Sequence, residues 1–417
     1  MTGLRAALAG LTTRGRCLLA AGLALSLCAL VLGQRDLLRA GVFLTALPLC
    51  SVAVVSRTRY RLACTRRVDP PRVAAGQPAT VRLRLDNVSR LPSGVLLMED
   101  ALPYALGGRP RFVLDRVAPQ TGRDVSYPVR ADVRGRYVIG PLSVRLADPF
   151  GLCELTRSFT SVEHLVVTPV VQPLPPVSLG GAWAAGGEVS ARAVAAGGSD
   201  DAATREYRHG DDLRKVHWRS TARVGELMVR REEQPFQSRA TVVLDGRRQA
   251  HRGDGPASSY EYAVSAAASI GVSLLRAGYQ LRLLAETGQD LGPPQHLLSE
   301  PVLLDALALA QTSRAASLTP VVERLRGGSD GAVIAVLGLL DAPDAERLAR
   351  LRAGAGTCVA VLLDVAGWGA SGVRDRRASG PAGALLAAAG WRVLQVPYGT
   401  PLATVWTGAG IRAGVPA

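Results

Sequence analysis

One stretch of the chain gathers many of the side chains that can do chemistry. Residues 205–235 read REYRHGDDLRKVHWRSTARVGELMVRREEQP, with carboxylates, imidazoles, hydroxyls and guanidinium groups close together. Ser220, His217 and Asp212 are the residue types of a nucleophilic triad. However, Asp212 and Ser220 are far apart on a short predicted helix, and neither a strand–turn elbow nor an oxyanion motif surrounds the serine. The pattern does not favour nucleophilic catalysis, and we predict no catalytic residue.

The same stretch contains the residue types of a metal site and of a nucleic-acid site. Its metal-ligand types straddle a predicted loop and helix without the spacing of a known ligand set, which disfavours a metal site. Its basic residues, with Tyr207 and Trp218 between them, suit phosphates and bases, but acidic residues nearly neutralise the segment, which disfavours nucleic acid. The metal-ligand types are His209, Asp211, Asp212 and His217.

Two interpretations of this stretch remain open. Arg and Trp are the side chains that most often anchor interfaces, so Trp218 with Arg219 and Arg223 would make a compact docking patch. Alternatively, ion pairs such as Asp211 with Arg214 brace the neighbouring segments internally. We predict an interaction motif formed by Arg205, Tyr207, Arg208, Gly210, Asp211, Asp212, Arg214, His217, Trp218, Arg219, Arg223 and Gly225.

Local signals predict the elements that carry this motif. Asp211 or Asp212 is a suitable N-cap for a helix over residues 213–223. Gly225 is placed to stop that helix, and residues 226–233 then read as a strand. We therefore predict a capped helix followed by a strand, at the boundary of the next domain.

Residues 240–417 alternate between short apolar runs and helical patterns. This alternation predicts a doubly wound α/β domain with a mostly parallel central sheet. Ligands of such sheets bind at the carboxyl ends of the strands, here near Asp245, Asp341 and Asp364. The predicted strands lie at residues 240–245, 281–286, 331–341 and 357–364 and at the end of 383–396.

Residues 61–172 show a different pattern, with period two. Val81, Leu83 and Leu85 fall on one face of a strand, and turn signals recur at short intervals. We predict an antiparallel β-sandwich of immunoglobulin-like size. Residues 173–203 lack periodicity and are rich in Pro, Gly and Ala, which predicts a flexible linker before the motif at residues 204–239.

Residues 1–60 predict a transmembrane hairpin. Two apolar runs, at about residues 17–34 and 38–56, approach the length that spans a bilayer. Residues 1–67 hold ten arginines and one acid, so much of the net charge of +15 flanks the hairpin, which further disfavours nucleic acid. The positive-inside rule places both termini and the bulk of the chain in the cytoplasm, as a multi-pass membrane protein. Scattered cysteines without a C-x-x-C pair fit this reducing compartment.

Two motifs carry a resemblance to a known family. RGRYVIGPLSVRLADPFGL, at residues 134–152, closes the predicted sandwich, and the long stretch REYRHGDDLRKVHWRSTARVGELMVRREE lies at residues 205–233. With the hairpin, these motifs make the chain resemble the domain-of-unknown-function-58 family over essentially its whole length. The resemblance implies a C-terminal domain like a von Willebrand factor type A domain. It also implies association with MoxR-type AAA+ ATPases and transglutaminase-like membrane proteins, without an established activity.

The resemblance raises the question of a metal site after the first strand of that domain. Type A domains often bind Mg²⁺ through Asp-x-Ser-x-Ser, completed by a Thr and an Asp on later loops. At the matching positions this chain reads Asp245-Gly246-Arg247-Arg248-Gln249. The guanidinium groups add like charge beside a dication and remove oxygen ligands, so we expect neither Mg²⁺ nor another cofactor. Asp245 and Asp341 are the remaining metal candidates.

Together these patterns predict a membrane-anchored, non-enzymatic scaffold or adaptor. The resemblance implies that its cytoplasmic domains dock a MoxR-type AAA+ ATPase or a related membrane partner. The alternative is a metal-dependent ligand-binding protein that uses the strand ends near Asp245. A hydrolase comes third, because the sequence assembles no set of nucleophile, base and oxyanion donors. Neither nucleic acid nor a small-molecule substrate is indicated.

Overall fold

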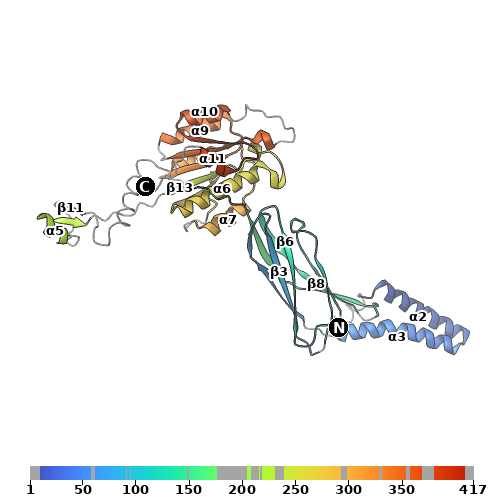
Figure 1. Cartoon of the computed structure of the whole chain (residues 1–417). Helices are drawn as coiled ribbons and strands as arrows, with labels where there is room; N and C mark the ends of the chain where they lie inside the picture. The colour runs from blue at the N-terminus through green and yellow to red at the C-terminus, as the bar shows by residue number, and fades with distance from the viewer. Residues whose placement is uncertain are drawn as a thin grey trace. The chain divides into compact units, whose positions relative to one another are not determined.

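The computed structural model divides into two compact units, Met1–Thr168 and Pro169–Ala417 (Figure 1). The first contains two apolar helices and a β domain, and the second contains a parallel α/β domain. The residues that the structure describes are 10–57, 62–90, 92–93, 95–147, 150–175, 204–207, 216, 218–230, 239–292, 298–327, 331–353, 357–368 and 380–408.

Two apolar helices, α2 (Thr13–Leu32) and α3 (Arg35–Arg57), lie near the N-terminus. The hydroxyl of Thr12 caps α2 by accepting from the N–H of Gly15, and Gly33 ends that helix in the left-handed conformation, at φ 64°. Both helices are long and apolar enough to cross a membrane, by length and composition. The predicted pair of apolar helices is confirmed, and both begin slightly earlier than predicted.

Small residues let these two helices approach closely. A Cβ atom at Gly22 would lie 2.7 Å from the nitrogen of Thr45, and one at Gly41 would lie 2.7 Å from the nitrogen of Ser26. Each helix therefore presents a pair of small residues, one turn apart, to the other helix. The hydroxyls of Ser26 and Thr45 donate to the carbonyl oxygens of Gly22 and Gly41, at 2.8 and 2.9 Å. The polar atoms of this contact are thus satisfied within an apolar hairpin.

The β domain contains three sheets around one hydrophobic core, in the orders β1-β3-β6, β2-β10-β7 and β5-β4-β8-β9. The pairing of β2 with β10 is parallel, and the other pairs are antiparallel. Val81, Leu83 and Leu85 are buried, as the period-two pattern predicts. The finer prediction of an immunoglobulin-like sandwich stays a prediction. The strands are β1 (Leu62–Asp69), β2 (Arg72–Ala74), β3 (Pro78–Asn87), β4 (Leu96–Asp100), β5 (Arg111–Leu114), β6 (Gly122–Arg130), β7 (Gly135–Ile139), β8 (Leu142–Ala147), β9 (Glu154–Ser158) and β10 (Glu163–Thr168).

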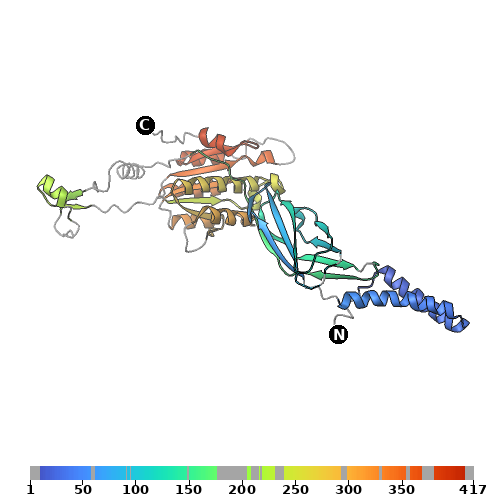
Figure 2. The same ribbon diagram turned by 60° about the horizontal axis from the view of Figure 1, so that its bottom comes forward.

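The second unit contains a five-stranded parallel sheet in the order β14-β13-β15-β16-β17. Its central strands, β13, β15 and β16, are buried on both faces because helices cover both faces. Val242 and Leu244 of β13 share a core with α6 and α7, whereas Val243 shares a core with α8, α9 and α10 (Figures 1 and 2). The predicted parallel α/β arrangement is therefore present. The strands are β13 (Arg239–Leu244), β14 (Gln280–Ala285), β15 (Ala332–Leu337), β16 (Cys358–Leu363) and β17 (Arg392–Val396).

One helix of this unit, α11, was not predicted. It buries Leu402 and Trp406 in the same core as α6 and α7. The helix α6 is rich in small residues because the sheet and α7 both pack against it, and so does the segment that holds Val171 and Leu174. The helices are α6 (Ser259–Arg276), α7 (Glu300–Leu309), α8 (Thr319–Arg326), α9 (Ala342–Ala349), α10 (Gly380–Ala388) and α11 (Leu402–Gly408).

A small segment precedes this sheet in the chain and carries part of the predicted interaction motif. Val216 forms a β-bridge with Val229, so the helix begins later than predicted, at α5. Gly225 follows the helix at φ 85°, in the position predicted for a stop. The predicted N-caps, Asp211 and Asp212, lie outside the described residues. The segment comprises an antiparallel pair and one helix, β11 (Thr204–Glu206), α5 (Trp218–Val224) and β12 (Met228–Arg230).

Candidate functional site

The topology of the parallel sheet indicates where a ligand site is expected. In chain order its strands lie 2-1-3-4-5, and the connections after β13 and β15 leave on opposite faces, to α6 and to α9. In open α/β sheets, ligands bind beyond the carboxyl ends of the strands at such a switch point. Asp245 directly follows β13 there, and Leu339 lies shortly after β15.

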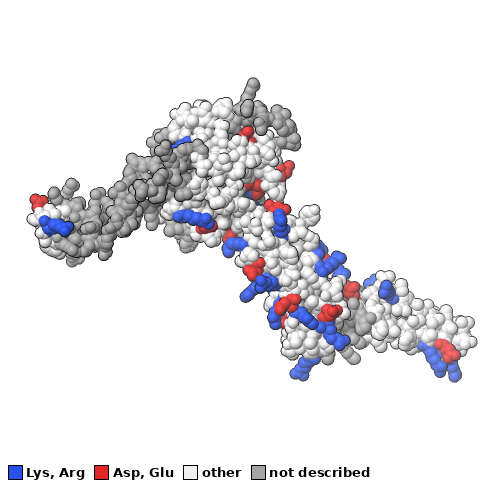
Figure 3. Space-filling view, in the orientation of Figure 1, with Lys and Arg blue, Asp and Glu red and all other residues white. Residues whose placement is uncertain are grey.

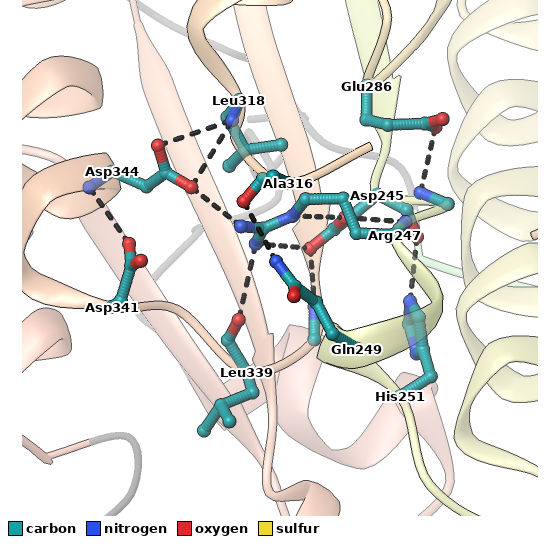
Figure 4. A network of polar contacts seen from close by, with 12 residues as sticks. Asp245, Arg247, Gln249, His251, Glu286, Ala316, Leu318, Leu339, Asp341 and Asp344 are labelled. Atoms are coloured by element: carbon teal, nitrogen blue, oxygen red, sulfur yellow. Dashed lines mark hydrogen bonds and ion pairs between the residues drawn. The ribbon is translucent and has the colours of Figure 1, made fainter. Parts of the chain in front are cut away.

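A buried arginine occupies this place (Figure 4). The side chain of Arg247 is 2% exposed, and its Nε and Nη2 donate to the two carboxylate oxygens of Asp245, each at 2.9 Å. Its Nη1 donates to Oδ2 of Asp344 at 2.6 Å, and Nη2 also donates to the carbonyl oxygen of Leu339 at 3.2 Å. The guanidinium therefore joins the segments that follow β13 and β15. Arg347 also forms an ion pair with Asp344. We call Asp245, Arg247, Asp344 and Arg347 the edge network.

Asp344 reaches the guanidinium from the first turn of α9. Asp341 is the N-cap of this helix, and its carboxylate accepts from the N–H of Asp344 at 3.0 Å. The buried carboxylate of Asp344 also accepts from the N–H of Leu318, at 3.2 Å, and from Arg347, at 2.7 Å. Of the two metal candidates, Asp245 therefore lies in the edge network, whereas Asp341 shapes the helix that supplies Asp344.

The formal charges of the edge network cancel. Arg247 and Arg347 supply the positive charges, and Asp245 and Asp344 supply the negative ones. Burial by itself lowers the pKa of Arg247, but hydrogen bonds to Asp245 and the attraction of the nearby aspartates outweigh this effect and raise the pKa above its ordinary value. Arg247 therefore remains charged, and its partners balance the cost of removing it from water.

The loop that contains Arg247 is held by contacts on both sides. The N–H of Gly246 donates to Oε2 of Glu286 at 3.0 Å, and a Cβ atom at Gly246 would lie only 2.5 Å from that oxygen. The N–H of Ser313 donates to the carbonyl oxygen of Gly246 at 2.7 Å, and the side chain of Gln249 donates to that of Ala316 at 2.8 Å. Gln249, which aligns with a metal-ligand position, is thus bonded to a neighbouring loop.

His251 contacts the edge network from the side of α6. Its Nε2 lies 2.7 Å from the carbonyl oxygen of Asp245, and its Nδ1 lies 3.1 Å from Oγ of Ser259. A carbonyl oxygen only accepts, so Nε2 carries the proton and Nδ1 of the neutral ring accepts from the serine. Burial lowers the pKa of His251, and attraction from Asp245 and Glu286 opposes this shift without cancelling it.

These contacts limit the chemistry of the carboxyl edge. The Arg247 guanidinium donates through all three of its nitrogens to protein oxygens, so it is not presented to an incoming phosphate or carboxylate. Ser259 is fully buried, and its Oγ also accepts from the N–H of Arg252. Its hydroxyl is therefore not accessible as a nucleophile. Within the described ranges, no group of three or more His, Cys, Asp or Glu residues is placed to hold a metal ion. The edge network is a closed, neutral arrangement that joins loops.

The predicted interaction motif is described only in part. Tyr207 follows β11, and its N–H donates to the carbonyl oxygen of Leu227 at 2.8 Å. Trp218 begins α5 with 70% of its surface exposed, and Thr221 on the same helix accepts from the N–H of Met228 at 3.0 Å. Arg205 lies in β11, Arg219 and Arg223 lie in α5, and Gly225 follows α5. Outside the described residues lie Arg208, Gly210, Asp211, Asp212, Arg214 and His217.

A second buried arginine lies in the β domain, and the sequence analysis did not single it out. Nη2 of Arg66, on β1, donates to Oδ1 of Asp100, and both side chains are almost completely buried. The hydroxyl of Tyr127 donates to the other oxygen of Asp100, and burial together with this bond raises the pKa of Tyr127. Nη1 of Arg66 donates to the carbonyl oxygen of Ser161. Gly140 leaves room for the guanidinium, because a Cβ atom there would lie 2.2 Å from Nη1.

Sequence reasoning also missed Asp344, His251 and Ser259. One local signal was available for Asp344, because Asp341 and Asp344 stand at the N-cap and N3 positions of a helix start, where one supports the other. No comparable pattern marks His251 as a neighbour of Asp245. Its position depends on how the loop after β13 turns back towards α6.

The fold and the site together define a class of protein. The chain combines two apolar helices that are compatible with membrane association, a β domain, and a parallel α/β domain whose carboxyl edge is closed by internal ion pairs. Residues 203–365 match the model of the family described as protein of unknown function DUF58, which supports the resemblance to this family over that part of the chain. The match includes the interaction motif and the whole edge network. No curated protein matches the sequence.

Similarities to solved structures are weak. The CARDB domain of a Pyrococcus furiosus protein, in complex with di-metal ions, is 11% identical over 26% of this chain and 93% of that chain, with a TM-score of 0.20. A complex of zinc 2-glycoprotein and prolactin inducible protein from human seminal plasma is 13% identical over 27% of this chain and 98% of that chain, with a TM-score of 0.20. β-Glucosidase 3B from Thermotoga neapolitana is 14% identical over 26% of this chain and 17% of that chain, with a TM-score of 0.13. These scores carry no conclusion about fold or function.

Proposed function

We propose that the protein is a membrane-anchored, non-enzymatic scaffold that docks a partner on the cytoplasmic side of a bacterial plasma membrane. The observation that carries the proposal is the exposure of apolar side chains in the β11–α5–β12 segment. Trp218 is 70% exposed, Val224 57% and Leu227 41%. Covering large apolar side chains is favourable, and Trp is enriched among the residues that anchor interfaces. This segment is therefore our proposed docking surface.

The N-terminal hairpin supports the membrane part of the proposal. A helix of 20 residues, the length of α2, is about 30 Å long, which matches the hydrocarbon core of a bilayer. Figure 3 shows a hairpin surface that is mostly uncharged, with charged side chains gathered at the end that is farther from the β domain. The exposed large apolar residues of the two helices are Leu23, Leu27, Leu30, Val31, Leu32, Val42, Phe43 and Leu49.

The distribution of arginine supports the proposed orientation. At the turn between the helices, Arg39 pairs with Asp36 at 3.1 Å, which offsets part of the positive charge there. At the opposite end, Arg14 and Arg16 begin α2 and Arg57 ends α3. The positive-inside rule then places this end, and the domains that follow, in the cytoplasm. Protease treatment of inside-out and right-side-out vesicles checks the orientation, since only the inside-out vesicles should expose the two domains.

The partner that we propose is a MoxR-type AAA+ ATPase or a transglutaminase-like membrane protein. The match of residues 203–365 to the DUF58 family model supports this choice, since association with such proteins is what the resemblance implied. We also propose that the α/β unit is a von Willebrand factor type A-like domain. Its parallel sheet with helices on both faces supports that assignment.

Binding of a MoxR-type ATPase from the same organism to the full chain in lipid nanodiscs tests the docking surface. If Trp218 anchors the interface, Trp218→Ala should weaken binding by about 30-fold, which corresponds to about 2 kcal/mol. Tyr104→Ala is the matched control, because Tyr104 is 98% exposed but lies in the β domain. Equal binding by the wild type and Trp218→Ala, or no binding at all, would contradict the proposal.

The second candidate, metal-dependent ligand binding near Asp245, has less support because the Arg247 guanidinium lies between Asp245 and Asp344. We propose that the protein uses neither Mg²⁺ nor another cofactor, and neither nucleic acid nor a small-molecule substrate. Calorimetry of the full chain with Mg²⁺, Mn²⁺ and Ca²⁺ should give no heat and no thermal shift. Saturable heat that Asp245→Asn abolishes would instead favour metal-dependent binding.

A further inference from the structure

Main-chain hydrogen bonds join the start of α2 to the region between β8 and β9, of which we call the described residues 150–153 the β8–β9 turn. The N–H of Thr12 donates to the carbonyl oxygen of Leu152 at 2.9 Å, and the N–H of Glu154 donates to that of Gly10 at 2.8 Å. The hydroxyl of Thr12 also donates to the carbonyl oxygen of Gly151 at 2.8 Å. The residues just before α2 therefore extend the edge of the sheet at β9, which places the turn beside the helix.

Side-chain packing holds the same junction together. A Cβ atom at Gly15 would lie 2.2 Å from the carbonyl oxygen of Leu152, so only glycine allows the turn to approach α2 this closely. Leu11, Cys153 and Val52 of α3 form a buried apolar cluster. Both helices of the hairpin thus contact the β8–β9 turn.

This junction sets the height of the turn relative to the proposed membrane. Gly15 lies two residues before Cys17, where the uncharged run of α2 begins, which corresponds to about 3 Å along the helix axis. The headgroup layer on each side of a bilayer is roughly 5–7 Å deep. Leu152, which lies against Gly15, therefore falls within that layer when α2 spans the bilayer. Arg14 and Arg16 are exposed at the same level, where they suit anionic headgroups.

Phe150 is the side chain that this turn offers to the layer. It lies two residues before Leu152 and is 66% exposed. In segments that lie at the membrane interface, Trp, Phe and Leu are the apolar side chains that are buried at the boundary between headgroups and acyl chains. We propose that the β8–β9 turn is a lipid-contacting surface, with Phe150 inserted into the headgroup layer. The inference rests on the proposed membrane placement of α2 and α3, and it makes the β domain a peripheral membrane contact in addition to its covalent anchor.

Tryptophan fluorescence in nanodiscs tests this contact in the full chain. The five native tryptophans all lie in the second unit, so an added tryptophan in the first unit can be followed against a constant background. We expect Phe150→Trp to add emission that is shifted to the blue and is quenched by lipids brominated near the headgroup. Phe43→Trp, near the middle of α3, reports insertion of the hairpin through quenching by lipids brominated deep in the acyl chains, and Tyr104→Trp reports a water-exposed site of the β domain.

The three variants separate the outcomes. Quenching at positions 150 and 43 but not at 104 supports the inference. Quenching at 43 alone overturns the inference and leaves the membrane anchor standing. Quenching at none of the positions overturns both, and quenching at all three overturns a contact that is local to the turn.

A variant of the junction provides a second test. Gly15→Val forces the β8–β9 turn away from α2, because the added side chain collides with the carbonyl oxygen of Leu152. In the Phe150→Trp background, this change should remove the quenching at position 150. Quenching at position 43, measured in a Gly15→Val and Phe43→Trp protein, should stay. Unchanged quenching at position 150 would show that the junction does not position the turn.

Discussion

The two buried arginines described above, Arg66 in the β domain and Arg247 in the α/β domain, are held in different ways. Arg66 faces one carboxylate, that of Asp100, and its Nε is buried without a hydrogen-bond partner among the described residues. Arg247 faces two carboxylates, and each of its guanidinium nitrogens donates a hydrogen bond. The pair in the strand core is thus less completely satisfied than the network in the loops.

We relate this difference to how the segments around each arginine are held in place. Strand pairing already orders the elements around Arg66, so an incomplete set of hydrogen bonds is tolerated there. Among the described loops at the carboxyl edge, main-chain pairing includes the isolated bridge between Arg247 and Ser313, and the saturated guanidinium of Arg247 joins these loops further. A fully satisfied buried network favours one arrangement, because each broken contact would leave a charge unpaired in a medium of low dielectric constant. We therefore interpret the edge network as a device that holds the loops in place.

Removing the Arg247 guanidinium should have the largest effect, because it leaves the buried carboxylate of Asp245 without its cation and that of Asp344 with Arg347 alone. We expect Arg247→Met to lower the local free energy of opening of β13 and β15 by about 4–5 kcal/mol. Amide hydrogen exchange of the full chain measures this loss. Arg248→Met is the control, because Arg248 is exposed and should change little. Equal exchange in the two variants would refute the proposed role of the edge network.

Arg66→Met should cost less, about 3 kcal/mol, because it leaves one buried carboxylate that still accepts from Tyr127. The loss should appear as faster exchange in β1, β3 and β6 and leave β13 unchanged. Arg67→Met provides the comparison, since Arg67 is the exposed neighbour on the same strand. A cost equal to that of Arg247→Met would remove the distinction between the two sites.

Tyr127→Phe examines the same carboxylate from its other side. The variant deletes a hydrogen bond to a charged group and should destabilise the β domain by about 1.5–2 kcal/mol. Tyr137→Phe is a suitable reference, because the Tyr137 hydroxyl donates to a neutral carbonyl oxygen, that of Val133, and should contribute about 1 kcal/mol. Hydrogen exchange in β6 and β7 distinguishes the two variants. A larger loss for Tyr137→Phe would contradict this ranking.

The smallest effect is a pH dependence at His251. Burial holds its pKa below the ordinary value of 6.5, so the unfolded chain binds the proton more tightly than the folded chain. Stability from this group is fully present above pH 6.5 and falls as the pH is lowered through 6.5 towards the folded pKa, by at most about 1.4 kcal/mol per pH unit.

Exchange in β13 between about pH 5.5 and 7 shows this dependence in the difference between the wild type and His251→Gln. The comparison is needed because Asp245, Arg247 and Glu286 face or surround the ring and influence the same region. If the two proteins respond to pH in parallel, His251 is not the responsible group.

Much of the fold could be predicted because its signals are local. The strands β15 and β16 are continuous apolar runs, as expected of strands buried on both faces, and all five strands of the parallel sheet were predicted. The helix α11 was missed because its pattern is short and follows Pro401. Its apolar residues, Leu402 and Trp406, have a surface to cover only once the sheet has formed.

Of the edge network, the sequence allowed us to place only Asp245. Asp245 could be placed at the end of the first strand of the sheet. Arg247 was interpreted as a charge that conflicts with a dication, but the sequence could not show which groups neutralise it. Asp344, the second of those groups, is 97 residues away in the chain. Arg66 was passed over although it stands at an inward position of an alternating strand.

The sequence by itself therefore determined the apolar hairpin, the alternating strands of the β domain, the parallel α/β pattern and the position of Asp245. Each of these follows from the hydrophobic period or from a turn signal within a few residues. Only the tertiary structure decided that Arg247 joins Asp245 to Asp344, that Arg66 joins Asp100, and that the β8–β9 turn contacts the start of α2. Such contacts depend on strand order and on the close approach of backbones at Gly15 and Gly140, and no local pattern encodes them.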